Sequence, residues 1–163
     1  MTAGTQREIR RLAFQALFQL DARADSDPGE LGAALEDIAA ESAPTLSRRE
    51  VEGALALALD AYRRRREADQ AVSELAPDWP APRQPAVDRA ILRLAFHEMT
   101  LPGARPKVVV NEAIELAKRY STERSPAFVN GVLDKILKSL PAGTAPPPTG
   151  TCADDEAAGG GAP

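Results

Sequence analysis

The chain has 163 residues, of which 44% are apolar and 4% aromatic, and it carries a formal charge of −4 at pH 7. This length fits one compact domain or two small helical halves, with a core made mainly of aliphatic side chains. The negative charge argues against a surface that binds nucleic acid everywhere, so a nucleic-acid site needs basic residues gathered in one place. The single Cys152 and the single His97 exclude an intrachain disulfide and a thiolate zinc site.

Helical periods run through the sequence without a convincing alternating strand pattern, which predicts an all-α protein. No signal peptide, lipidation motif or apolar run of membrane-spanning length is apparent. We therefore expect a soluble, cytoplasmic protein that makes no contact with a membrane.

The first predicted helix covers residues 5–22, with Thr5 and Glu8 spaced as a capping box. Its core stripe contains Ile9, Leu12, Ala13, Ala16 and Leu20. A second stripe carries Arg7, Arg10, Arg11, Phe14 and Phe18. Guanidinium groups bind phosphate and aromatic rings stack on single-stranded bases, so this stripe is a candidate RNA-binding surface. The alternative is that the rings are buried and the arginines only solvate a helix end; we place Phe14 in the core.

Two further helices are predicted over about 30–42 and from about 47 to 75. Within the longer one, Arg63–Arg66 surround the helix and do not line one face. We interpret this run as a solvated helix end, with a secondary phosphate contact as the alternative. The prolines of 77–82 mark a boundary between the two helical halves, about 5–76 and 84–140, and Trp79 is expected to pack against the body.

Three helices follow, over about 85–101, 106–120 and 125–140. We expect His97 to be an ordinary surface or hydrogen-bonded residue, and Arg93 to pair with Glu112. Gly131 costs its helix about 1 kcal/mol against alanine, which indicates a close helix approach or a ligand against the backbone. Residues 141–163 have the composition of a disordered acidic tail.

No P-loop, dinucleotide fingerprint, nucleophile elbow or metal-ligand spacing is present. Glu112 is a single carboxylate without a nucleophile partner, so it makes no acid–base pair. We therefore predict a binding protein and not an enzyme, with no cofactor, no catalytic residue and no metal site.

The segments VDRAILRLAFHE (87–98), NEAIELAK (111–118) and FVNGVLDKI (128–136) strongly resemble the NusB family of bacterial transcription antitermination factors. The resemblance covers about residues 5–140. It implies a compact bundle of about seven helices in two halves, with a bend near Arg63–Arg66. The same fold occurs as the N-terminal domain of some rRNA cytosine methyltransferases, so the resemblance indicates the fold more firmly than the activity.

The resemblance implies an antitermination factor that binds the boxA element of nascent rRNA transcripts as a single strand. It would act together with NusE, a small-subunit ribosomal protein, in an RNA polymerase complex with other Nus factors, and support processive rRNA transcription. Some family members pair as homodimers and others do not, so that question stays open. Two alternatives remain: a stand-alone relative of the methyltransferase RNA-binding domain, and a helical module that binds only proteins.

The predicted RNA-binding residues are Arg7, Arg10, Arg11, Phe18, Asp88 and Phe128. The resemblance supports the arginines as phosphate contacts and Phe18 as a stacking ring. Phe128 lies at the edge of its helix with Gly131, although it also fits the core. Asp88 can accept a hydrogen bond from a base amino group, or it can cap the fifth helix. Finally, the acidic tail is a candidate cover for the basic N-terminus.

Overall fold

The computed structural model describes residues 2–23 and 27–141. Within these residues the chain is all helical, which confirms the predicted fold class. The helices are α1 (Ala3–Ala22), α2 (Pro28–Ser42), α3 (Arg48–Arg63), α4 (Arg65–Leu75), the short 3₁₀ turn η1 (Ala81–Arg83), α5 (Ala86–Met99), α6 (Pro106–Tyr120) and α7 (Ser125–Ser139). None of the described helices is long and apolar enough to cross a membrane. The predicted acidic tail lies outside the described residues.

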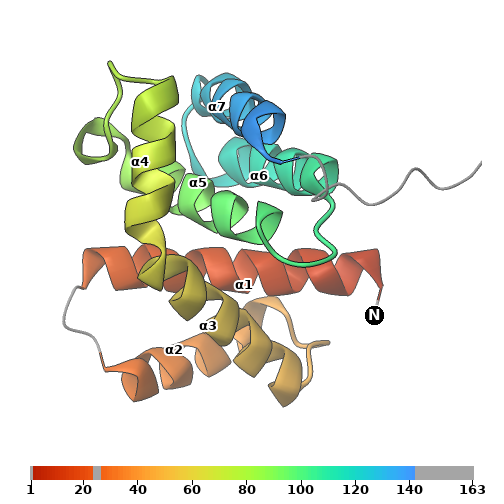
Figure 1. Cartoon of the computed structure of the whole chain (residues 1–163). Coiled ribbons are helices and arrows are strands. Elements are labelled where there is room, and N and C mark those ends of the chain that lie inside the picture. Colours follow the sequence, from red (N-terminus) through yellow and green to blue (C-terminus); the bar gives the residue numbers. More distant parts are fainter. Residues whose placement is uncertain (1, 24–26, 142–163) are drawn as a thin grey trace, which may run out of the picture.

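Helix α1 crosses the middle of the molecule, with α2 and α3 on one side and α4 to α7 on the other (Figure 1). One continuous hydrophobic core joins both sides, and α1 contributes Leu12 and Leu17, which are fully buried. Helix α4 packs against α5 and α7 and has little contact with α3. In space, therefore, the chain changes sides near Arg64, where α3 ends, and not at the proline segment.

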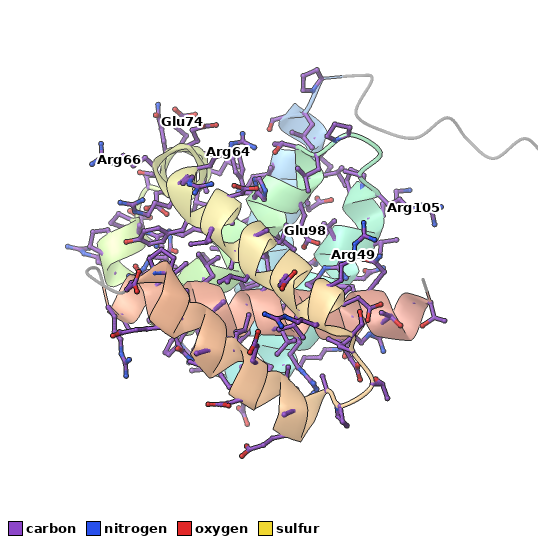
Figure 2. All side chains as sticks on the ribbon, turned by 90° about the horizontal axis from the view of Figure 1, so that it is seen from below. Arg49, Arg64, Arg66, Glu74, Glu98 and Arg105 are labelled. Carbon is purple, nitrogen blue, oxygen red and sulfur yellow. The ribbon has the colours of Figure 1, made fainter. Side chains whose placement is uncertain are left out.

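The break inside the arginine run is confirmed, and it has a local cause. Arg64 leaves helical geometry, with φ −94° and ψ 9°, and its guanidinium donates a hydrogen bond to the Thr100 hydroxyl at the end of α5. Arg65 stacks on the Tyr62 ring at 4.0 Å from its centroid. Arg66 points into solvent at the molecular edge, opposite the edge that carries Arg105 (Figure 2). The four arginines therefore have different neighbours.

The predicted capping box at the start of the first helix is wrong. The side chain that caps α1 is Thr2, which accepts a hydrogen bond from the Thr5 amide at 3.1 Å, so Thr5 lies inside the first turn. The observed capping box belongs to α3, where Ser47 and Glu50 cap each other. The same short spacing occurs at both places, and only the backbone conformation decides which one caps.

The proline segment also differs from expectation at Trp79. Its backbone carbonyl accepts a hydrogen bond from the side-chain Nε2 of Gln84 at 2.9 Å, and this contact fixes the loop. Nevertheless the residue keeps 47% of its surface exposed. Because the loop is held through its backbone, the ring does not need to pack against the body.

Candidate nucleic-acid interface

Helices α1 and α6 run in the same direction, and a cleft of about 500 Å³ lies between the first half of α1 and α6. Two side-chain contacts join the two helices, Arg7 with Glu112 and the Phe14 ring with the Tyr120 ring, whose centroids are 5.1 Å apart. Five basic and three acidic side chains line the cleft. The predicted arginines lie here, each held in a different way.

Arg7 is the most accessible of the three, with 68% of its side chain exposed. Its Nε and Nη2 donate to the Glu112 carboxylate at 3.0 to 3.3 Å. This hydrogen bonding and the charge of Glu112 raise the pKa of Arg7. An exposed ion pair is weak, so an incoming phosphate can replace Glu112 as the partner of Arg7.

Arg10 is enclosed, with 13% of its side chain exposed. Its Nε donates to both oxygens of the Glu98 carboxylate at 3.0 and 2.9 Å, and Glu98 lies inside the bundle (Figure 2). Burial raises the pKa of Glu98, although the hydrogen bonds from Arg10 oppose that rise. This pair fastens α1 to α5 in a place where phosphate has little access.

Arg11 serves the end of a neighbouring helix. Its Nη2 donates to the carbonyl of Ser42, the last residue of α2, at 2.7 Å. Within the described chain, its Nε and the Oε1 of Gln15, one turn further along α1, are buried without a hydrogen-bond partner. Arg11 thus lines the cleft with its guanidinium bound to the end of α2, while its Nε is buried away from the surface.

The two rings of α1 differ in burial. Phe14 is 3% exposed and belongs to the core, as predicted, whereas Phe18 keeps 37% of its surface exposed. Phe128 on α7 is half-buried and packs against the edge of the core. Near it Gly131 faces open space, because a Cβ added at this position would have no heavy atom of the described residues within 4 Å. The close helix approach predicted at Gly131 is therefore wrong.

Asp88 is almost fully buried, with 3% exposed. Its carboxylate accepts hydrogen bonds from the hydroxyls of Ser121 and Ser125, at 2.5 and 2.9 Å. It ties the start of α5 to the turn between α6 and α7. Among the described residues no side chain caps α5, so the capping alternative for Asp88 is wrong.

The predicted residues thus fall into two groups. Arg7, Arg10 and Arg11 lie along the cleft between α1 and α6. The others lie where the second half of α1, the start of α5 and the start of α7 converge. The contacts that define this end are Asp21 of α1 with Arg89 of α5, and Asp88 of α5 with Ser125 of α7.

The expected pair of Arg93 and Glu112 is wrong. Arg93 donates to Asp69 of α4 at 2.7 Å and to Asp21 of α1 at 3.0 Å. Burial by itself raises the pKa of Asp21, but hydrogen bonds from Arg89 and Arg93 hold it below the usual value. The network joins three helices, and a helical wheel of α5 alone cannot show which of them Arg93 faces.

Comparison with known proteins decides the family. The NusB family model matches residues 7–138. The chain belongs to the NusB family. The transcription antitermination protein NusB of Anaeromyxobacter dehalogenans is 39% identical over 132 residues, covering 81% of this chain and 89% of that protein. The protein of the same name from Solibacter usitatus is 36% identical over 143 residues, covering 88% and 95%. These relatives are named as transcription factors and not as enzymes.

Solved NusB structures share the fold. T. maritima NusB has a TM-score of 0.68 with 36% identity, covering 85% of this chain and 94% of that one. A second structure, described as NusB and NusE in complex with double-stranded RNA, has a TM-score of 0.71 with 28% identity. That match covers 85% of this chain and all of the other.

The second wall of the cleft was not predicted from the sequence. Lys118 and Arg119, in the last turn of α6, line it opposite Arg7 and Arg11. The available signal was the position of Lys118 on the polar face of its helix, away from the apolar residues that pack in the core. The wheel shows that this face is polar, but only the parallel packing of α6 beside α1 brings it to the arginines.

Proposed function

We propose that this chain is a transcription antitermination factor that binds boxA RNA of nascent rRNA transcripts as a single strand, together with NusE. In this role it joins the RNA polymerase complex with other Nus factors and supports processive rRNA transcription. The observation that carries the proposal of RNA binding with NusE is the match, over 85% of this chain, to a structure described as NusB and NusE in complex with double-stranded RNA. Membership of the NusB family supports the same conclusion.

The charges and exposures of the residues support a division of labour. Arg7 and Arg11 supply phosphate contacts, because both line the cleft and Arg7 is mostly exposed. Arg10 and Asp88 act as framework residues, since each is buried and hydrogen-bonded inside the protein. RNA affinity therefore depends on them through the position of α1 and α5.

Single-strand recognition is favoured by the exposed ring of Phe18 and the half-buried ring of Phe128. Bases of a duplex are stacked on one another, whereas a single strand can place its bases on protein aromatic rings, at about 1–3 kcal/mol per stacked base. Phe18 and Phe128 are placed at the end of the bundle where α1, α5 and α7 meet. We propose Phe18 as the principal stacking ring and Phe128 as a second one.

The test compares a boxA-type single strand with the duplex of the same sequence, with and without NusE. The variant Arg7→Ala/Phe18→Leu removes one exposed cation and one exposed ring, and the matched control Lys138→Ala/Trp79→Leu does the same elsewhere on the surface. We expect single-strand preference, strengthened by NusE, and weaker binding with a shallower salt dependence only in the first variant.

Each contrary result has a separate meaning. Tighter binding of the duplex would contradict the single-strand proposal. Equal binding by both variants would move the RNA site away from α1. If the unmodified protein bound neither RNA form with NusE present, the RNA-binding function itself would be refuted.

A further inference from the structure

The cleft between α1 and α6 has cations on both walls. Arg7 and Arg11 come from α1, and Lys118 and Arg119 come from α6. The Lys118 side chain is 60% exposed and contacts Glu115 at 3.4 Å, three residues earlier. Such an exposed pair is weak, so Lys118 is available to an anion in the cleft.

Arg119 is exposed but held in position by aromatic packing. Its guanidinium carbon lies 5.3 Å from the centroid of the Tyr120 ring, and that ring packs on Phe14 of α1. Tyr120 therefore links the end of α6 to the helix that carries Arg7 and Arg11. Cations held on two packed helices keep a fixed separation, which lowers the entropy cost of binding a multivalent anion.

The local charge also favours an anion. The whole chain has a net charge of −4, yet this cleft has five basic and three acidic lining residues. One of the acids, Glu112, already faces Arg7 at 3.0 Å and Arg10 at 3.9 Å. Another acid, Glu115, pairs with Lys118, so the lining cations that make no ion pair within the described residues are Arg11 and Arg119.

We propose that Lys118 and Arg119 form a second phosphate-binding wall, so that the backbone of the bound RNA strand lies in the cleft between α1 and α6. This inference rests on the proposed RNA-binding function and extends it to α6. The cations of the two helices then contact successive phosphates, while the exposed Phe18 ring in the second half of α1 engages a base. Phosphate contacts position a strand without reading its sequence.

A basic last turn also stabilises a helix through its dipole, so the control must share that role. Helix α7 has the same length as α6 and carries two exposed lysines near its end, Lys135 and Lys138, which do not line the cleft. We would compare Lys118→Gln/Arg119→Gln with Lys135→Gln/Lys138→Gln. Far-UV circular dichroism and thermal unfolding verify that both variants remain folded.

Binding of a boxA-type single strand and of a uridine-only strand of equal length would be measured over a salt series. For the α6 variant we expect affinity for both strands to fall roughly threefold to tenfold at low salt. The slope of log affinity against log salt should become shallower by about 1.4, at about 0.7 per lost single-strand phosphate contact. The α7 control should bind like the unmodified protein.

The outcomes separate this inference from the proposed function. If the unmodified protein binds RNA and the α6 variant matches the α7 control in affinity and slope, the second wall is refuted and the proposed function stands. A loss confined to the boxA-type strand would also overturn it, because it would indicate base reading. If the unmodified protein binds neither strand, both proposals are refuted.

Discussion

Replacing Arg10 with alanine should destabilise the bundle by about 3 kcal/mol. Arg10 and Glu98 are 13% and 12% exposed, and both Glu98 oxygens accept hydrogen bonds from the Arg10 Nε. Removing one partner of such a pair leaves an uncompensated buried charge, which costs about 3–5 kcal/mol. We take the lower end because Glu98 can relieve the cost by taking up a proton. Urea unfolding followed by circular dichroism measures the change.

The loss of stability in the Arg10→Ala variant, relative to the unmodified protein, should depend on pH; we call this loss the deficit. Burial already raises the pKa of Glu98, and without Arg10 nothing opposes that rise. When a carboxyl group has a higher pKa in the folded protein than in the unfolded chain, where it is about 4.3, the folded protein loses stability as pH rises through the folded pKa. The deficit should therefore be larger at pH 8 than at pH 5.5. A deficit that shrinks with rising pH would contradict the burial of Glu98.

A second variant separates framework from RNA contact. Replacing both partners, as Arg10→Met/Glu98→Leu, removes the buried charges together and should restore most of the lost stability. If Arg10 acts only by fastening α1 to α5, this folded variant should bind RNA nearly as well as the unmodified protein. A well-folded double variant that has lost RNA binding would show that Arg10 itself contacts RNA and would refute the framework assignment.

Three further predictions address other residues. Glu112→Gln should strengthen RNA binding about twofold to fivefold at low salt by freeing Arg7, and the gain should vanish beside Arg7→Ala. Glu8→Gln removes the same charge from the cleft but frees no cation, because Glu8 is bonded to the Thr45 hydroxyl, so it should give a smaller gain. Gly131→Ala should raise the unfolding free energy by about 1 kcal/mol in urea, since its Cβ meets open space; a loss of stability would show that this surface is covered. Burial and a neighbouring guanidinium lower the pKa of His97, so unfolding free energy should fall as pH drops below about 6.5. Because the chain has one histidine, its NMR titration is unambiguous, and a midpoint above 6.5 would contradict this prediction.

Local patterns predicted the local structure of this chain well. Apolar periodicity located most of the helices, but it predicted a single helix over about 47–75, and only the family resemblance implied the break between α3 and α4. Phe14 was correctly placed in the core, although the helical wheel puts it on the stripe that carries the arginines, because most phenylalanine side chains are buried. The positions of the helices depend on residues within a few turns of each other, and a single sequence displays these residues directly.

Partners distant in the sequence could not be predicted in the same way. A wheel gives the direction of Arg10 on α1, but Glu98 is 88 residues away and its position follows from how α5 crosses α1. The predicted pair of Arg93 with Glu112 was wrong for the same reason, because Arg93 faces α1 and α4 and not α6. Residue types on a polar face indicate that ion pairs form there, whereas tertiary packing selects which ones.

The difference between Arg7 and Arg10 explains how one arginine-rich segment can serve both stability and binding. They lie three residues apart on α1, so they share a face, but Arg10 points toward α5 while Arg7 reaches the rim of the cleft. A buried cation is costly to expose and therefore holds the helix in place; an exposed one exchanges partners cheaply. Fixing α1 through Arg10 keeps Arg7 opposite the α6 wall before RNA arrives, so binding has less ordering entropy to overcome. Mutating all the arginines together would merge the two effects, and only variants that keep the buried pair intact can report on phosphate contacts.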